Sequence, residues 1–407
     1  MLDKNNSACQ DSRPYRLENM VQNYAWGTRN ADAFIPDLLG IKAEPHETYA
    51  ELWMGVHPKA PSAVIASEHG PQHLSTWISE NLDERLSNKQ EHSHLTGLPY
   101  LLKVLSAGEA LSIQAHPNKT QAEILHQQDP EHYPDGNHKP EIAIALDHLD
   151  ALVGFISDSQ YAELLQKYPE LDALLTQNQH GPLNLREGLH HIFDVWEHDG
   201  NVISDTIQKL HEGLRLKDNP DESEQLFLEQ FDKRGAKDIG LIFIFLLNRI
   251  HLGPGEAIFL GPGVPHAYLK GNIIECMANS DNVVRLGLTD KFCDAGALRD
   301  ILVYDEKVDY QIRPSLQGHR IEYNTPVTEF SIKSLDLSEG NSERVTSHSS
   351  LTMYLLVEGE ICLYWGDNHK TCTCVIKRGD SFITPANLSD YEIRAQQDSK
   401  LYLVELP

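Results

Sequence analysis

Residues 251–288 read HLGPGEAIFLGPGVPHAYLKGNIIECMANSDNVVRLGL, and they are the most informative part of the chain for the fold. Glycine and proline interrupt short apolar runs every few residues, which is typical of strands joined by tight turns. The order of a Gly-acid turn, an apolar strand, a proline and another strand recurs in VIKRGDSFITPANL at 375–388. Closed or rolled antiparallel sheets carry this pattern. We therefore expect two related β domains.

The rest of the chain divides into strand-rich and helix-rich parts. Residues 49–56, 100–105 and 142–145 are short apolar runs bounded by turn residues, which predicts strands, and a helix is predicted over 120–126. Between 157 and 237 apolar residues fall at helical spacing. The predicted fold is mainly β with an α-helical insert, built as tandem cupin or jelly-roll barrels.

These patterns give three expected domains. A cupin domain is predicted from residues 1–156 together with 239–307, a helical insert domain from 157–238, and a C-terminal cupin-like β domain from 308–407; the motifs described below make the first of these the expected catalytic domain. An apolar helix is expected at 239–250. The C-terminal domain has Pro-Ala-Asn-Leu at 385–388 where the first has Pro265-His-Ala-Tyr. We therefore expect no metal in the C-terminal domain.

The net charge and the apolar runs of the chain limit the kinds of partner that we expect. Sixty acidic and 34 basic residues among 407 give a net charge of −26, which repels phosphate backbones and anionic lipid surfaces. The N-terminal MLDKNNSACQDSRPYRLENM lacks the apolar core of a signal peptide, and the longest apolar run, 239–247, is too short for a bilayer span. We expect a cytoplasmic protein with neither a nucleic-acid nor a membrane partner.

Ala110-Leu-Ser-Ile-Gln-Ala-His-Pro117 is the first candidate for chemistry. Its alternation places Ser112, Gln114 and His116 on one face of a strand, where an amide oxygen and an imidazole nitrogen can converge on an ion. Taken alone, the motif is better explained by a hydrogen-bonded histidine on a polar strand face.

Two further motifs can complete such a site. Lys139 and Glu141 share a face at the entry to an apolar strand, although a surface ion pair is the favoured interpretation of these two residues alone. Prolines in Gly261-Pro-Gly-Val-Pro-His266-Ala-Tyr268 stiffen the turn before His266, as a preorganised ligand requires. Nitrogen and oxygen donors of this mixture suit a catalytic zinc, and the ligand types also allow iron or manganese.

The segment 275–291 adds positive charge to the same strand-rich unit. It carries Arg285 and Lys291 in a protein that is strongly acidic overall. Arginine favours bidentate contacts with phosphate or carboxylate, so the pair indicates an anionic substrate. Surface ion pairs are the alternative interpretation.

Six motifs together resemble the type I mannose-6-phosphate isomerases, in the order of that family. They are Gln22-Asn-Tyr-Ala-Trp-Gly27, Ala50-Glu-Leu-Trp-Met-Gly-Val-His-Pro58, Leu98-Pro-Tyr-Leu-Leu-Lys-Val-Leu105, Gln114-Ala-His-Pro-Asn-Lys119, Lys139-Pro-Glu141 and Asn279-Ser-Asp-Asn-Val-Val-Arg285. The helical insert and the β-rich tail also fit the family's three-part layout. Leu286 and Asp290 depart from the residues common in relatives, alanine and proline.

The resemblance implies a zinc-dependent aldose–ketose isomerase that interconverts mannose 6-phosphate and fructose 6-phosphate on a cupin barrel, with one zinc ion per chain. The implied metal ligands are Gln114, His116, Glu141 and His266. The implied catalytic residues are Arg285, Lys139, Glu275, His57 and Lys291. The implied substrate-binding residues are Trp26, Glu51, Lys103, Ser112, Tyr268 and Asp281.

The reaction moves a proton between C1 and C2 through an enediol, so it needs a base, a group that stabilises an oxyanion and a phosphate anchor. Arg285 suits oxyanion stabilisation because its guanidinium is always protonated. His57, Lys139, Glu275 and Lys291 all remain candidates for the proton carrier. A cupin iron oxygenase and a non-catalytic sugar-phosphate sensor are the alternatives; Gln114 fits the first poorly, and Arg285 would be superfluous in the second.

Overall fold

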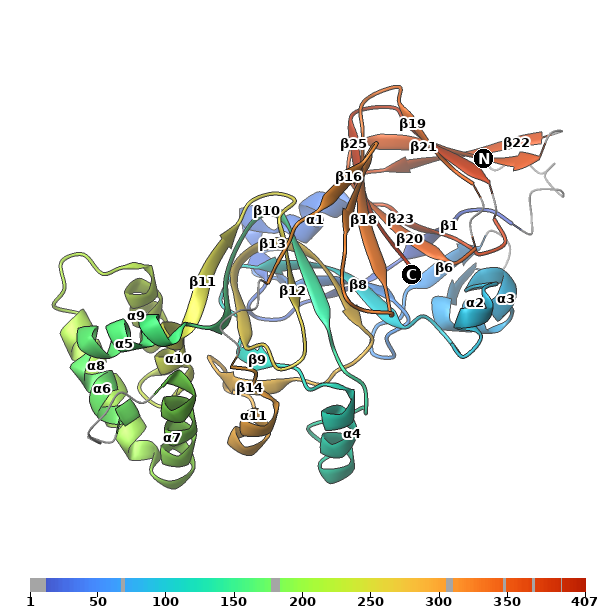
Figure 1. The fold of residues 1–407 in the computed structure, drawn as a ribbon. Helices are drawn as coiled ribbons and strands as arrows, with labels where there is room; N and C mark the ends of the chain where they lie inside the picture. The colour runs from blue at the N-terminus through green and yellow to red at the C-terminus, as the bar shows by residue number, and fades with distance from the viewer. Residues whose placement is uncertain are drawn as a thin grey trace.

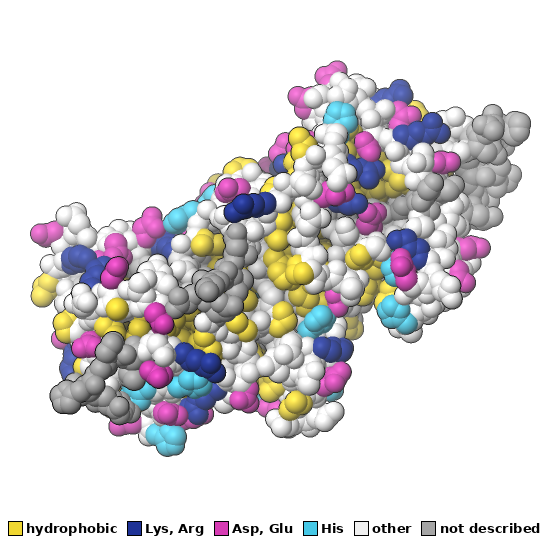
Figure 2. Space-filling model, viewed as in Figure 1, with side chains coloured by type: hydrophobic (Ala, Val, Ile, Leu, Met, Phe, Trp, Pro, Cys, Tyr) yellow, Lys and Arg dark blue, Asp and Glu magenta, His cyan; other side chains and the backbone are white. Residues whose placement is uncertain are grey.

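The computed structural model describes residues 12–66, 70–176, 184–304, 310–346, 349–367, 370–388 and 390–407. A bundle of helices lies at one end of the molecule, a β domain occupies the middle, and a second β domain lies at the other end (Figure 1). Acidic and basic side chains are interspersed over the visible surface (Figure 2). No helix in these ranges is both long and apolar enough to cross a membrane.

The central β domain is built on a ten-stranded antiparallel sheet. The strands along its main path are β15 (Gln311–Ile312), β12 (Ala257–Leu260), β10 (Glu141–Phe155), β13 (His266–Ala278), β8 (Tyr100–Ala107), β5 (Glu51–Gly55) and β2 (Met20–Gln22). The strands off this path are β9 (Ile113–Ala115) and β14 (Val284–Gly287), which pair with each other, and β11 (Leu247–Leu252), which pairs with β10. The strands predicted at 49–56, 100–105 and 142–145 are confirmed.

Strand β8 shows how the sheet separates its core from its functional face. All eight of its residues are buried. Tyr100, Leu102 and Val104 pack in one apolar core, while Lys103 between them faces a cavity on the other side. Because successive side chains in a strand point to opposite faces, alternate residues can serve packing and chemistry separately.

The helical part of the structure lies between β10 and β11. Its helices are α5 (Asp158–Lys167), α6 (Pro169–Thr176), α7 (Leu185–His198), α8 (Gly200–Leu214), α9 (Glu222–Arg234) and α10 (Gly240–Leu246). Ser157, Asn184 and Asp221 each form a capping box that fixes a helix start. Phe193, Phe227 and other apolar side chains from these helices form one buried core.

The helix expected over 239–250 is wrong beyond Leu246. Residues from Leu247 to Leu252 form β11, which pairs with the second half of β10 from Leu149 to Phe155. The backbone hydrogen bonds that β10 supplies override the helical spacing of the apolar residues, because local propensity is only a weak preference.

The second β domain packs a nine-stranded sheet against a four-stranded one. The first sheet runs β16 (Ser315–Gln317), β17 (Arg320–Tyr323), β18 (Ser331–Leu337), β25 (Ser399–Glu405), β20 (Thr352–Glu358), β23 (Ser381–Thr384), β1 (Tyr15–Glu18), β6 (Ala63–Ala66) and β7 (Gly70–His73). The second runs β19 (Ser342–Val345), β24 (Tyr391–Ala395), β21 (Glu360–Asp367) and β22 (Lys370–Lys377). Leu356, Leu363 and Phe382 belong to the core between them.

Strand β1 ties the N-terminal part of the chain to this second domain. Tyr15 pairs with Ile383 of β23 on one side, and Leu17 pairs with Val64 of β6 on the other. The predicted boundary after Lys307 lies outside the described residues, and the three-part division stays a prediction.

The remaining elements are short. They are β3 (Thr28–Arg29), β4 (Thr48–Tyr49), α1 (Phe34–Leu39), α2 (Leu74–Ser79), α3 (Leu82–Arg85), α4 (Lys119–Gln128), α11 (Ala295–Ile301), and 3-10 turns at Asn30–Asp32 and Gln90–His92. Helix α4 confirms the helix predicted at 120–126. Its start is fixed by a capping box between Asn118 and Gln121.

Candidate active site

The four predicted metal ligands come from three strands of the central sheet. Gln114 of β9 lies directly opposite His266, the first residue of β13. Glu141 opens β10, which pairs with β13 along most of its length. His116 follows β9 by one residue. Antiparallel pairing therefore brings together residues that are up to 152 positions apart, from Gln114 to His266.

His116, Glu141 and His266 form a buried cluster whose donor atoms lie within 4.8 Å of one another. Nε2 of His116 lies 3.5 Å from Oε2 of Glu141, and Nε2 of His266 lies 3.1 Å from Oε1. Tetrahedral donors at about 2.0 to 2.1 Å from zinc are separated by roughly 3.3 Å. The spacing of the donors therefore fits a zinc ion.

The hydrogen bonds of the two histidines also fit a metal site. Nδ1 of His116 bonds the carbonyl oxygen of Asn282 at 2.8 Å, and Nδ1 of His266 bonds that of Val264 at 2.9 Å. These carbonyls require a proton on each Nδ1, which leaves each Nε2 as the atom with a lone pair. Both Nε2 atoms are buried without a hydrogen-bond partner. Metal-binding histidines are oriented in this way.

Burial and charge put these groups in the protonation states that a cation needs. Burial, assisted by the charge of Lys139, lowers the pKa of His116 to about 4. Burial opposes ionisation of Glu141, but the charge of Lys139 outweighs it and holds the pKa of that carboxyl well below its usual range. His116 thus offers a neutral imidazole and Glu141 an ionised carboxylate.

Gln114, the fourth predicted ligand, lies on the cavity side of this cluster. It lines the cavity, and its side-chain amide makes no hydrogen bond to any described residue. Tyr268 donates to Oε1 of Glu141 at 3.2 Å, and Lys139 donates to Oε2 at 3.0 Å. Each oxygen of the Glu141 carboxylate therefore accepts a hydrogen bond that fixes its orientation.

A cavity of about 520 Å³ opens above this cluster. Twelve of the residues singled out in the sequence line it. They are Trp26, Glu51, His57, Lys103, Ser112, Gln114, Lys139, Tyr268, Glu275, Asp281, Arg285 and Lys291. The structure therefore brings together all fifteen predicted site residues: twelve line the cavity, and the other three form the buried cluster whose Glu141 is bonded to the lining residues Tyr268 and Lys139. Asp290, one of the two departures from the family pattern, also lines the cavity, whereas Leu286 is buried in the core.

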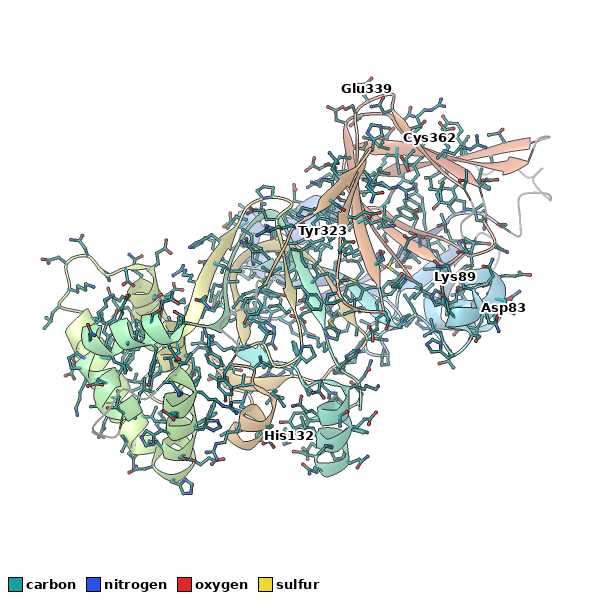
Figure 3. All side chains as sticks on the ribbon, in the orientation of Figure 1. Asp83, Lys89, His132, Tyr323, Glu339 and Cys362 are labelled. Carbon is teal, nitrogen blue, oxygen red and sulfur yellow. The ribbon has the colours of Figure 1, made fainter. Side chains whose placement is uncertain are left out.

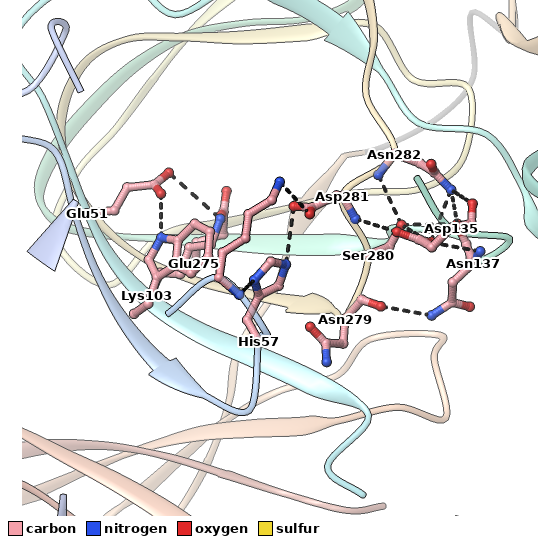
Figure 4. A network of polar contacts seen from close by, with 12 residues as sticks. Glu51, His57, Lys103, Asp135, Asn137, Glu275, Asn279, Ser280, Asp281 and Asn282 are labelled. Atoms are coloured by element: carbon pink, nitrogen blue, oxygen red, sulfur yellow. Dashed lines mark hydrogen bonds and ion pairs between the residues drawn. The ribbon is translucent and has the colours of Figure 1, made fainter. Parts of the chain in front are cut away.

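One wall of the cavity carries a buried ion network (Figure 4). Nζ of Lys103 lies 2.9 Å from Oε2 of Glu275 and 3.7 Å from Oε1 of Glu51. Trp53 donates its indole N–H to Glu51. Burial raises the pKa of Glu275, although the charge of Lys103 opposes that shift.

A histidine–aspartate pair forms another part of the wall. Nδ1 of His57 accepts from the backbone N–H of Lys59 at 3.3 Å, so Nε2 carries the proton and faces Oδ1 of Asp281 at 3.2 Å. Nζ of Lys59 lies 2.8 Å from the other oxygen of Asp281. Burial opposes ionisation of Asp281, but His57 and Lys59 together lower its pKa well below the usual range.

Two cations in the cavity are left without counterions. Arg285 in β14 lies opposite Gln114 of β9, and Lys291 follows it at the rim. Within the described part of the chain, neither side chain forms an ion pair or hydrogen bond. Desolvation lowers the pKa of both groups. Cations without a partner among the described residues, in a protein of net charge −26, have the charge that an anionic ligand would require.

Sequence reasoning missed several cavity residues. Lys59 stands two positions after His57 within a quoted motif, and the motif itself could have suggested it. Arg234, at the end of α9, reaches the cavity from the helical part, and no motif marks it. Trp53 was inside a motif but was not assigned to the site.

Tandem β barrels with a buried His-Glu-His cluster below a cationic cavity define a metal-binding protein of the cupin class. A family model for the phosphomannose isomerase type I catalytic domain matches residues 15–157. The chain belongs to the mannose-6-phosphate isomerase family. The human mannose-6-phosphate isomerase is 35% identical, with 86% of this chain and 88% of that protein covered. Mannose-6-phosphate isomerase 2 of Arabidopsis thaliana is 34% identical, with 95% and 92% covered.

Solved structures agree with this assignment. A point mutant of phosphomannose isomerase from Salmonella typhimurium superposes with a TM-score of 0.85 at 31% identity, covering 97% of this chain and 99% of that one. A zinc-bound mannose 6-phosphate isomerase gives a TM-score of 0.84 at 31% identity, with the same coverage.

Proposed function

We propose that this protein interconverts mannose 6-phosphate and fructose 6-phosphate, with one zinc ion held by Gln114, His116, Glu141 and His266. One observation carries the proposal: a buried donor cluster of zinc spacing opens onto a cavity that contains two cations without counterions. When bound, zinc supplies a Lewis acid that polarises the O1 and O2 oxygens of the open-chain sugar. The unpaired cations supply the charge that a phosphorylated substrate needs.

We assign the phosphate to Lys291 and Ser112. The ammonium of Lys291 lies at the rim, where the end of an extended hexose would reach, and the hydroxyl of Ser112 precedes the ligand strand β9. Arg285 lies deeper, beside Gln114. Its fixed guanidinium is placed to stabilise negative charge on oxygen as the enediol forms.

We assign the proton transfer between C1 and C2 to Glu275. Both ring nitrogens of His57 are engaged by Lys59 and Asp281, and Lys139 is bonded to Glu141. Glu275 lines the cavity, and Lys103 fixes one of its oxygens. Burial raises its pKa, which brings a carboxylate closer to the value that general-base catalysis at neutral pH requires.

The test is a coupled assay for fructose 6-phosphate formed from mannose 6-phosphate. Activity should disappear on chelation, return with zinc, and fall about 100-fold or more in Glu275→Gln, which keeps the shape of the side chain. A zinc-loaded, folded wild type without turnover contradicts the proposed reaction. Full activity in Glu275→Gln contradicts only the assignment of the base.

The remaining expectations stay proposals. The net charge of −26 supports the absence of a nucleic-acid partner. A cytoplasmic location is consistent with a phosphorylated metabolite as substrate.

A further inference from the structure

The loop from Asp129 to Asn137 reaches the active site without lining its cavity. Within it, Oδ1 of Asp135 accepts from the hydroxyl of Ser280 at 2.8 Å, and Oδ2 accepts from the backbone N–H of Asp281 at 2.8 Å (Figure 4). Both oxygens of one carboxylate thus hold a turn that is about 145 residues away in the sequence.

Asn282 is the next residue in this turn, and its side chain is fully buried. Its amide nitrogen donates to the carbonyl oxygens of Asp135 and Asn137, at 2.5 and 2.9 Å. Its own carbonyl oxygen accepts the Nδ1 proton of His116 at 2.8 Å. The turn that Asp135 holds therefore carries the group that orients one proposed zinc ligand.

The two histidine ligands differ in how they are supported. The carbonyl that orients His266 belongs to Val264, only two residues earlier, so the local turn fixes it. The carbonyl that orients His116 lies 166 residues away in the sequence, and no turn next to His116 fixes it. It lies two residues before Val284, which pairs with Ala115, so the β9–β14 pairing holds it from one side. Its position depends on the contacts that hold residues 280–282.

We propose that Asp135 is a positioning residue for the metal site, acting through the 280–282 turn on Nδ1 of His116 and, through Asp281, on His57. The inference rests on the proposed ligand set. Asp135 touches neither a ligand atom nor the cavity; it sets the place of the carbonyl that His116 needs. Second-sphere partners of this kind commonly change metal affinity by about 10- to 100-fold when they are removed.

The test compares zinc affinity in Asp135→Asn and in wild type, measured by competition with a chromophoric chelator. The amide keeps the size of the side chain but presents an NH2 group to one of the two donors, so the turn should shift. We expect zinc affinity to fall about 10- to 100-fold, with an altered visible spectrum of the cobalt-substituted protein. Wild-type affinity and an unchanged cobalt spectrum in Asp135→Asn would overturn the proposal.

Asp129→Asn is the matched control. Asp129 belongs to the same loop and accepts from the backbone and ring of His132 at 3.2 and 2.7 Å, but it makes no contact with residues 280–282. Figure 3 places His132 between α11 and α4, where it stacks on Phe292. Zinc affinity should stay within about twofold of wild type in this variant. An equal loss in both variants means that general loop order is responsible and refutes a specific role for Asp135.

Two further measurements keep the test decisive. If Asp135→Asn does not fold, Ser280→Ala is the substitute. It removes the bond to Oδ1 of Asp135 together with the contacts of the same hydroxyl with the Asn137 carbonyl and the Asn282 N–H. Zinc binding should weaken in the same direction by about a few-fold, and unchanged affinity would then refute the proposal. A second variant, His116→Ala, distinguishes a wrong ligand set from a wrong role for Asp135. A wild type that binds no more zinc than His116→Ala would contradict the ligand set itself, whereas an unaffected Asp135→Asn beside a zinc-binding wild type contradicts only the role of Asp135.

Discussion

Lys103 and Glu275 lie directly opposite each other on the neighbouring strands β8 and β13, with Nζ 2.9 Å from Oε2. Both side chains are buried, so water screens neither charge. The pair joins two central strands of the sheet and forms part of the cavity wall at the same time. Stability and chemistry are therefore coupled at this position.

Replacing Lys103 by methionine should destabilise the protein by about 3 to 5 kcal/mol, because it leaves Glu275 and Glu51 buried without their counterion. Urea denaturation measures the loss. The double variant Lys103→Met with Glu275→Gln should recover part of it, since one orphaned charge is then gone. If the free energy of unfolding of Lys103→Met is within about 1 kcal/mol of the wild-type value, the pair is not as desolvated as the structure indicates.

Arg285→Lys should lower kcat by about 100-fold with a much smaller change in KM, because an ammonium cannot reproduce the fixed donor geometry of a guanidinium. Steady-state kinetics with mannose 6-phosphate separates the two constants. Lys400→Arg, far from the cavity, is a control for the change of cation. A rise in KM at constant kcat would assign Arg285 to ground-state binding instead.

Lys291→Met should raise KM for mannose 6-phosphate and weaken inhibition by inorganic phosphate by a similar factor, on the order of 10-fold for the loss of one charge-assisted contact. Inhibition constants for phosphate in wild type and variant provide the measurement. Lys59→Met is a matched control, because that lysine is already paired with Asp281. Equal effects in the two variants would indicate a diffuse field and no specific anchor.

Removal of zinc should lower thermal stability as well as activity. A ligand that binds only the folded state at 1,000 times its dissociation constant contributes about 4 kcal/mol. Calorimetry of the chelated and reconstituted protein should show the difference, and His266→Ala should abolish it. A zinc-dependent increase in melting temperature that persists in His266→Ala would locate the metal elsewhere.

Acid should weaken the helical part of the structure through Glu224. Burial opposes ionisation of this carboxyl, but hydrogen bonds from Lys217 and Tyr168 outweigh it and lower its pKa to about 2. Because the folded pKa is lower than the unfolded one, the stabilisation is complete above about pH 4.5 and is lost as the pH falls toward 2.

Glu224→Gln should therefore be less stable than wild type at pH 7, by about 2 kcal/mol for the loss of charged hydrogen bonds. The difference should shrink between pH 4.5 and 2. Denaturant unfolding at several pH values checks both statements. A constant difference across that range would show that Glu224 does not titrate as the structure indicates.

Local patterns were sufficient to predict many elements of the fold. The apolar run at 142–145 was a recognisable strand, and α4 was recognisable from its helical spacing. The end of α10 could not be recognised from the sequence, because the change to a strand at Leu247 depends on pairing with β10. The place of β1 was not predictable either: Tyr-Arg-Leu-Glu contains nothing that specifies pairing with β23.

The residues of the site also fall into two groups: those that a local sequence pattern reveals and those that only the tertiary structure brings to the site. Gln114 and His116 are recognisable because alternation in a strand places them on one face. Glu141 is recognisable at the entry to an apolar strand, and His266 after a turn stiffened by prolines. Arg234 and Asp135 act through tertiary placement: the first arrives from a helix, and the second supports a turn about 145 residues away. Sequence spacing carries no information about such distances.

The pairing of β1 with β23 cannot form until nearly the whole chain has been synthesised. Residue 15 leaves the ribosome about 370 residues before its partner at 383, roughly 20 to 70 s at ordinary rates of synthesis. During that interval β1 and β6 have one open edge, which is a site for mispairing with other chains. A nascent chain that stops before β23 therefore leaves this edge unpaired, although every proposed zinc ligand has already been synthesised.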